Sequence, residues 1–247
     1  KHPNALQTFG CSDGQVTKMA PGSELGGNKY KLKIFQTNLT LLANVLIGIV
    51  VGAVLVFAFR NGIPLGATPL HATLCVVGYQ LLMSQAILAM SPNNGWSSYL
   101  KLVDKKRAHL VLQIMGSGLA IAGSFIKILD KEVHWNSLHG QFALVALVFT
   151  SVCLVNGLAS LYAYEARKFL PGNISKLTHV CFGIVAYSAA GITLCIGFNK
   201  GVFVNWASQP VANAVIAFTT AFSLIVIINP CITFFNKSMQ LSKLSRV

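Results

Sequence analysis

Six apolar runs, each roughly 20 residues long, dominate the chain, and short polar links separate them. An isolated run of this length crosses the hydrocarbon core of a bilayer as an α-helix. The runs are Phe35–Phe59, Ala67–Met90, Ala108–Leu129, Leu138–Tyr164, Leu177–Phe198 and Val211–Phe235. The pattern predicts an all-α membrane protein whose six transmembrane helices form one domain, residues 35–235. We expect residues 1–34 to be a disordered tail and residues 236–247 to be a short basic tail.

Four of the runs carry a single histidine near the start: His71, His109, His139 and His179. After three of them, mostly small residues recur on the same helix face at spacings of three, four and seven. These stripes are Gln113, Gly116, Ala120 and Gly123; Ala143, Ala146, Thr150, Cys153 and Gly157; and Gly183, Ala186, Ala190, Thr193 and Gly197. Small residues also allow membrane helices to pack closely, but packing alone does not explain the imidazole that begins each stripe. A flat macrocycle between helices needs small neighbours and a ligand on each face.

Basic residues are unevenly divided between the two sides of the predicted bundle. The charged fraction is only 10%, yet the net charge is +13. Both termini and the second and fourth loops carry 15 of the 19 Lys and Arg residues, which leaves four for the other side. The excess places both termini in the cytoplasm. The positive net charge is therefore explained by the topology and by attraction to anionic lipid headgroups. We expect a lipid bilayer, and no nucleic acid, as the partner.

The alternating direction of the helices pairs the four histidines by depth. His71 and His139 fall on the non-cytoplasmic side, whereas His109 and His179 fall on the cytoplasmic side. His109 and His139 are separated by most of a helix length, roughly 25 Å at 1.5 Å per residue, which excludes cross-pairing. Two ligands are too few for a closed zinc site, but two axial nitrogens complete six-coordinate haem iron. We therefore predict two b-type haems in a central four-helix bundle, one held by His71 and His139 and one by His109 and His179.

Other side chains offer weaker alternatives for binding iron. Met83, Met90 and Met115 are possible axial ligands, but filling of the core explains all three. The six cysteines are scattered and include no C-x-x-C pair, which argues against a disulfide framework and a structural zinc site. Without C-x-x-C-H, haem would be held by its axial ligands and by packing alone.

Two function classes compete with a redox protein. A haem-free transporter or channel for small solutes would use buried histidines to relay protons. A structural membrane subunit would present its tails to partner proteins. An absorption spectrum separates these classes, because a redox protein of this kind carries a reducible b-type signal from about two haems per chain.

Several short motifs around the histidines carry a resemblance to a known family. They are Leu70-His71, Met90-Ser91-Pro92, Lys105-Lys106-Arg107-Ala108-His109, Val111-Leu112-Gln113, Leu138-His139-Gly140-Gln141 and Leu177-Thr178-His179. Over about residues 35–235 the chain resembles the six-helix cytochrome b561 proteins, and most of all their domain-containing branch. The resemblance implies a transmembrane one-electron reductase. Family members are homodimers, so we expect a homodimer, in an endoplasmic reticulum or vesicle membrane rather than the plasma membrane.

The resemblance also implies the direction of electron flow and its donor. Cytoplasmic ascorbate would reduce the haem held by His109 and His179. The electron would pass to the haem held by His71 and His139, and then to monodehydroascorbate or a ferric chelate on the lumenal or extracellular side.

Charged and aromatic residues near each site are candidates for binding these substrates. Ascorbate is a monoanion at neutral pH, and a basic cluster near the cytoplasmic site would attract it or hold haem propionates. This cluster consists of Lys101, Lys105, Lys106, Arg107 and Lys176. The positive-inside bias alone would place lysines here, and we favour a functional role for the three that closely precede His109. On the opposite side, the candidates for the acceptor are His134, Trp135 and Asn136.

Overall fold

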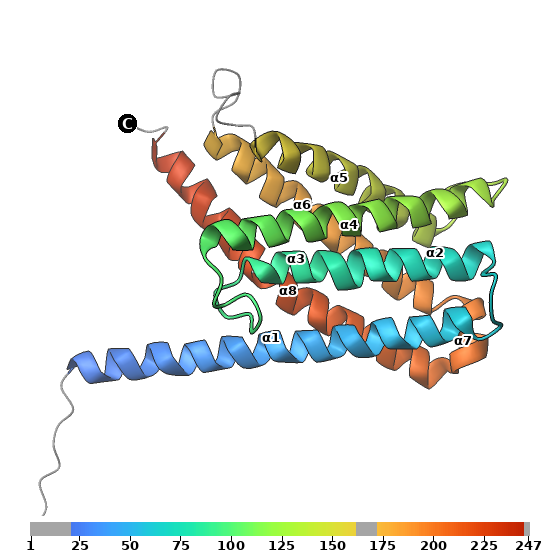
Figure 1. The fold of residues 1–247 in the computed structure, drawn as a ribbon, viewed down its shortest axis with the longest axis horizontal. Helices are drawn as coiled ribbons and strands as arrows, with labels where there is room; N and C mark the ends of the chain where they lie inside the picture. The colour runs from blue at the N-terminus through green and yellow to red at the C-terminus, as the bar shows by residue number, and fades with distance from the viewer. Residues whose placement is uncertain (1–20, 162–171, 245–247) are drawn as a thin grey trace, which may run out of the picture. The chain divides into compact units, whose positions relative to one another are not determined.

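The structure, a computed structural model, describes residues 21–161 and 172–244, and all regular elements in these ranges are helical. The elements are α1 (Pro21–Phe59), α2 (Ala67–Cys75), the π-helix η1 (Val76–Met83), α3 (Ser84–Ala89), α4 (Leu102–Leu129), α5 (Leu138–Leu161), α6 (Gly172–Phe198), α7 (Gly201–Ala207) and α8 (Gln209–Leu244). Figure 1 shows their arrangement. The chain divides into two compact units, residues 1–35 and residues 36–247. Of the first unit, residues 21–35 form the beginning of α1, and the second unit contains the helical bundle.

Six helical stretches of the described chain are long and apolar enough to cross a membrane. They lie in α1, in the continuous span formed by α2, η1 and α3, and in α4, α5, α6 and α8. This confirms the predicted fold class and identifies an integral, multi-pass membrane protein.

Several predicted boundaries are wrong because the helices extend beyond the apolar runs. α1 begins at Pro21, so residues 21–34 are helical and not a disordered tail. Likewise, α8 continues to Leu244 through most of the predicted second tail. Extending an existing helix costs little, since the nucleation cost has already been met, and proline suits a first helical turn. Residues 1–20 and the predicted end of the fourth span at Tyr164 lie outside the described residues.

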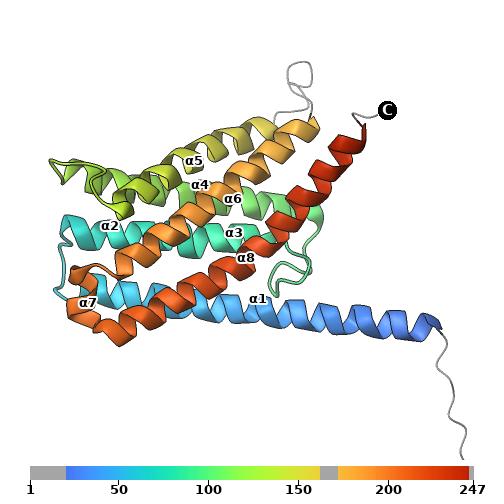
Figure 2. The ribbon, with the colours of Figure 1, turned by 180° about the vertical axis from the view of Figure 1, so that it is seen from behind.

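The central helices form two packed pairs. The span α2–η1–α3 packs against α4, and α5 packs against α6, while α4 also contacts α5. Figure 2 shows α8 alongside α6 from behind, as their contacts require. Helices α1 and α8 also contribute to the core, through buried side chains such as Val50 and Val54 of α1 and Phe222 and Val226 of α8. We call the end where α2 and α5 begin the His71 end, and the end where α4 and α6 begin the His109 end.

Two glycines bring η1 and α4 into main-chain contact. A Cβ atom added at Gly78 would lie 2.7 Å from the oxygen of Gly116 and 2.8 Å from the nitrogen of Ala120. A Cβ atom at Gly116 would lie 3.0 Å from the oxygen of Gly78. No larger residue fits either position without moving the helices apart, so this contact fixes the distance between the two spans.

The short helix α7 was not predicted, and it closes the His71 end with aromatic side chains. The buried ring of Phe203 lies 5.2 Å from Phe57 and from Phe198, and 5.6 Å from Trp206, between ring centres. The guanidinium of Arg60 stacks 4.1 Å above the centre of the Phe57 ring. A seven-residue helix gives too short a pattern to read from sequence, and packing against α1 and α6 stabilises it.

Candidate functional site

The four intramembrane histidines lie in two pairs, matched as the sequence predicted. His71 of α2 and His139 of α5 have ring centres 6.2 Å apart and planes at 76°. At the other end, His109 of α4 and His179 of α6 also lie 6.2 Å apart, with planes at 80°. Each site therefore joins the α2–α4 pair of helices to the α5–α6 pair, and the two sites share one geometry.

Each imidazole is held through Nδ1 by a helix other than the one that carries it. Three Nδ1 atoms lie 2.8–2.9 Å from main-chain oxygens, in the pairs His71–Gly123, His109–Ala86 and His139–Thr193. The fourth, in His179, lies 3.5 Å from the Sγ atom of Cys153. Because a carbonyl oxygen only accepts, the Nδ1 atoms that face one must donate. Their Nε2 atoms therefore keep the lone pair that a metal ion requires, an arrangement typical of metal-binding histidines.

The spacing of the rings fits a single iron between each pair. A metal–imidazole bond is about 2.0 Å long and the ring centre lies about 1.1 Å behind the nitrogen, so two collinear ligands have centres about 6.2 Å apart. The observed 6.2 Å agrees with this value at both sites. In the described residues, no group of three or more His, Cys, Asp or Glu side chains gathers as a metal site. Two nitrogen donors at each site suit the axial positions of haem.

Glycines lie against two of the imidazoles. A Cβ atom at Gly197 would stand 3.1 Å from Cε1 of His139, and one at Gly157 would stand 3.0 Å from Cε1 of His179. These residues end the stripes that begin at His179 and His139, so the far end of each stripe packs on the histidine of the neighbouring helix. The absence of a side chain leaves room for the ring.

A small cavity lies between His71 and His139. The predicted stripes supply much of its wall. Apart from the two histidines, the lining residues are Cys75, Tyr79, Ser124, Ala143, Ala146, Ala190, Thr193 and Leu194. Of these, Ala143, Ala146, Ala190 and Thr193 belong to the stripes. Small side chains, together with Tyr79 and Leu194, therefore line the space between the two imidazoles, and small neighbours are what a flat macrocycle needs.

Of the three methionines considered as alternative ligands, only Met83 fills the core, so the expectation of core packing is wrong for Met90 and Met115. Met83 is buried, and its side chain packs against Gly116. Met90 and Met115 are exposed on the outer surface of the helices. None of the three is needed to complete a site that already has two imidazoles.

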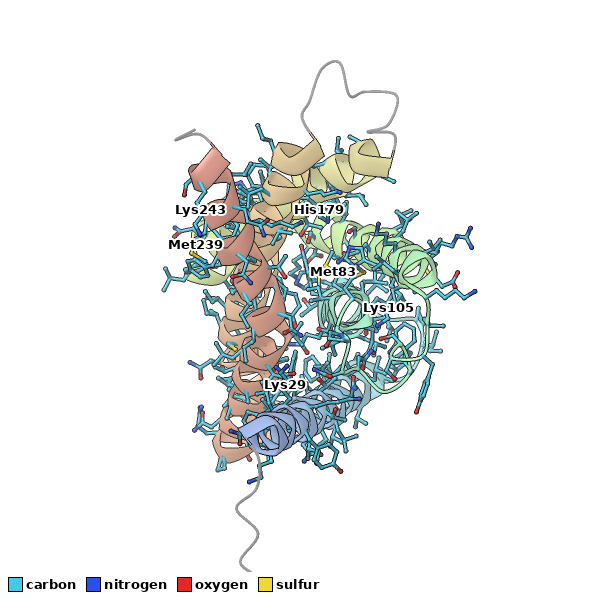
Figure 3. All side chains as sticks on the ribbon, turned by 90° about the vertical axis from the view of Figure 1, so that its left-hand side faces the viewer. Lys29, Met83, Lys105, His179, Met239 and Lys243 are labelled. Carbon is cyan, nitrogen blue, oxygen red and sulfur yellow. The ribbon has the colours of Figure 1, made fainter. Side chains whose placement is uncertain are left out.

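At the His109 end, one of the five predicted basic residues is buried. Lys105 is only 9% exposed, and its Nζ donates to the main-chain oxygen of Ser91 at 3.3 Å. It lies one helical turn before His109, on the same face of α4. Figure 3 labels Lys105 of α4 and His179 of α6. The described residues provide no carboxylate partner for this ammonium, so its charge is available to an anion.

The other basic candidates at this end are exposed, and one further lysine joins them. Lys101 and Lys106 extend into solvent, and the exposed Arg107 forms an ion pair of 3.4 Å with Asp104. Lys176 of α6 lies close enough to Lys237 of α8 for the two charges to interact, and Lys237 also interacts with His179. Sequence reasoning did not single out Lys237, because nothing in its own span marks it.

At the His71 end, three lysines lie within electrostatic reach of the imidazoles. Lys127 interacts with His71, and Lys131 and Lys200 interact with His139. The Nζ atom of Lys127 donates to the Thr68 hydroxyl at 2.7 Å and pairs with Asp130 at 2.5 Å. Sequence reasoning missed Lys127 and Lys200. The sequence feature that could have identified them is their position in the chain. Lys127 follows Gly123, the last glycine of one stripe, by four residues, and Lys200 follows Gly197, the last glycine of another, by three.

The acceptor-side candidates His134, Trp135 and Asn136 lie in the exposed α4–α5 loop. His134 donates from Nε2 to the main-chain oxygen of Ile128 at 2.9 Å, and Trp135 adopts a left-handed backbone with φ of 58°. The main-chain oxygen of Trp135 accepts from Gln141 at 3.3 Å. These contacts support the loop conformation, and none of the three side chains reaches the histidine pair through a hydrogen bond in the described structure.

The model of the family Eukaryotic cytochrome b561 matches residues 70–204, more than half of the chain and all four intramembrane histidines. The chain belongs to the cytochrome b561 family. Transmembrane reductase CYB561D2 from Bos taurus, Mus musculus and Homo sapiens is 28% identical over 131 residues, which are 51% of this chain and 59% of each relative. The chain thus spans less than two thirds of the length of these relatives. Cytochromes b561 bind haem, in agreement with the donor set at both ends of the bundle, and the relatives confirm the resemblance to the domain-containing branch.

Proposed function

We propose that this chain is a transmembrane one-electron oxidoreductase that holds two haem b groups. His71 and His139 are the axial ligands of one, and His109 and His179 are those of the other. The observation that carries the proposal is the pair of equivalent imidazole sites, each with ring centres 6.2 Å apart, at the two ends of one bundle. Haem supplies a one-electron iron couple when bound.

The helices hold the ligands and keep the two sites apart. His179 contacts Cys153, which follows His139 by 14 residues on α5, so the sites are roughly 21 Å apart along the helix. That distance is about two thirds of the hydrocarbon thickness. A haem held at each site would therefore give the electron one redox site near each membrane surface. The Nδ1 hydrogens are committed to carbonyl oxygens at three of the four histidines, which disfavours a proton relay that must exchange both ring nitrogens.

The donor is ascorbate, and it enters at the His109 end, which the distribution of basic residues places in the cytoplasm. Lys105 supports this assignment because, among residues 21–161 and 172–244, its buried ammonium has a carbonyl oxygen as its one hydrogen-bond partner. Lys176 and Lys237 add positive charge beside His179. A partly desolvated cation attracts an anionic substrate more strongly than a fully hydrated one.

The acceptor at the His71 end is an anion. Topology biases basic residues to the other side, yet Lys127, Lys131 and Lys200 gather around this pair of imidazoles. Monodehydroascorbate and ferric chelates of organic acids both carry negative charge, so both remain acceptors in the proposal. The homodimer and the endoplasmic reticulum or vesicle membrane stay predictions.

Purified protein in vesicles tests the whole proposal. We expect a reducible b-type spectrum with about two haems per chain. With ascorbate trapped at the His109 face, the haems should be reduced and then reoxidised by monodehydroascorbate or ferric citrate added at the other face. A colourless preparation would exclude the redox assignment, and reduction only by ascorbate added at the His71 face would reverse the direction.

A further inference from the structure

The contacts between histidines and neighbouring helices are reciprocal within each helix pair. His71 binds the main-chain oxygen of Gly123 on α4, and His109 on α4 binds that of Ala86 on α3. In the second pair, His139 binds the oxygen of Thr193 on α6, and His179 on α6 contacts Cys153 on α5. Each span therefore carries one histidine and, further along, one residue that receives the histidine of its partner.

The separation between these two positions is the same in three spans and longer in one. It is 14 residues in α4 (His109 to Gly123), α5 (His139 to Cys153) and α6 (His179 to Thr193), but 15 in the span from His71 to Ala86. In a regular α-helix, 14 residues return to within about 40° of the starting face, and one more residue adds a rotation of about 100°. With regular geometry throughout, 15 residues would place the Ala86 oxygen about 60° beyond the starting face, which is about 100° from the direction that the receiving residue takes in the other three spans.

The π-helix η1 lies between these two positions and accommodates the additional residue. A π turn contains one residue more than an α turn, so the face is restored after it. The contact between Gly78 and Gly116 locates the extra residue more closely. On α4, Gly116 is seven residues from both His109 and Gly123, whereas Gly78 is seven residues after His71 and eight before Ala86. The additional residue therefore falls between Gly78 and Ala86.

We propose that η1 is a positioning element that sets the register of the two histidine sites. Its additional residue lets one span present His71 to Gly123 and the Ala86 oxygen to His109, on either side of a fixed main-chain contact. The register is defined by the contacts between the histidines and the neighbouring helices, and it does not depend on the proposed function. Only the use of haem binding to measure it rests on that function. A π segment has poorer hydrogen-bond geometry than an α-helix, and here it compensates for the additional residue, so that both histidine contacts are kept.

Two single-residue deletions in the full chain test this role. Deletion of Leu81 shortens η1 and leaves 14 residues between His71 and the residue that receives His109, as in the other spans. Deletion of Val148 in α5 is the matched control, because both residues lie five positions before the residue that receives the partner histidine. Leu81 packs against the core, whereas Val148 is 49% exposed, so loss of the side chain alone would do more harm at Leu81.

The readouts are the haem-to-protein ratio, the low-spin spectrum of each site and the midpoint of thermal unfolding. We expect the Leu81 deletion to keep both haem signals and the Val148 deletion to lose at least one. A Leu81 deletion that loses a haem or fails to assemble overturns the proposal, as does a Val148 deletion that keeps both. If the unaltered protein binds no haem, the proposed function fails instead. The register is then judged by unfolding alone, and the Val148 deletion should lower the midpoint more than the Leu81 deletion does, although Leu81 is the one packed against the core.

Discussion

At the His71 end, aromatic side chains of α1 and α7 pack together and three lysines lie within electrostatic reach of the imidazoles, whereas at the His109 end the buried Lys105 lies one helical turn before His109 and Lys237 interacts with His179. The imidazoles themselves have the same spacing and nearly the same relative orientation at both ends. The imidazole geometry that the two ends share follows from helix register. The lysines and aromatic residues that differ between the ends lie in the loops and near the helix ends. In this bundle, the geometry of the imidazole pairs and the charge around them are therefore separable features.

Replacing one histidine at each end gives the largest expected effect. His109→Ala should lose the haem of its own site and keep the other, so the haem-to-protein ratio falls by about half, since one imidazole cannot hold a six-coordinate haem. His71→Ala should show the reverse pattern. A haemochrome assay with the spectrum of the remaining site measures both.

The two variants should also differ in their reaction with ascorbate. His109→Ala should not be reduced from the His109 face, whereas His71→Ala should still be reduced there. Equal reduction of both variants from that face would show that the two ends do not have distinct entrances.

Removing one lysine from each end should separate donor from acceptor binding. A charge-assisted hydrogen bond to an anion is typically worth about 1.5–3 kcal/mol, so Lys105→Ala should raise the KM for ascorbate by about 10–100-fold. Lys127→Ala should leave that KM unchanged and raise the KM for the acceptor by only a few-fold, since Lys127 is already paired with Asp130. Steady-state rates in oriented vesicles measure both constants.

Lys106→Ala is the control for this comparison, because Lys106 adds a similar charge next to Lys105 but is exposed. We expect a change within about twofold. If Lys106→Ala were as harmful as Lys105→Ala, the field of the whole face would matter, and burial of Lys105 would have no special role.

The smallest effect is expected from the glycines that face the imidazoles. Gly197→Ala places a methyl group 3.1 Å from Cε1 of His139, and Gly157→Ala places one 3.0 Å from Cε1 of His179. The rings must shift by a few tenths of an ångström, at a cost on the order of 1 kcal/mol. Each variant should change the low-spin signal of its own site only. Gly118→Ala, where the added Cβ atom meets nothing within 4 Å, is the matched control.

The sequence was sufficient for the spans and the pairing of the histidines. Long apolar runs define membrane helices with little ambiguity, and alternation of direction then assigns His71 and His139 to one end. The stripes that end at Gly157 and Gly197 also lie where helices meet the imidazoles. These features depend on composition and on regular α-helical spacing, both of which can be read directly.

The features that escaped prediction depend on departures from regular helices or on tertiary contacts. η1 is invisible because its span is apolar on nearly every face, so a change of register leaves no trace in the pattern. The burial of Lys105 depends on the oxygen of Ser91, 14 residues earlier in the chain. Lys200 is the N-cap residue of α7, a helix that packing stabilises.

Three of the imidazoles are held by main-chain oxygens, those of Gly123, Ala86 and Thr193. A side-chain substitution of similar size does not remove a carbonyl group, so a scan of point variants would pass over Ala86 and Thr193 although the carbonyl group of each orients an imidazole. Their importance would emerge only from changes in chain length. Related sequences should accordingly vary in residue type at these two positions while the number of residues that separates each from its histidine stays constant.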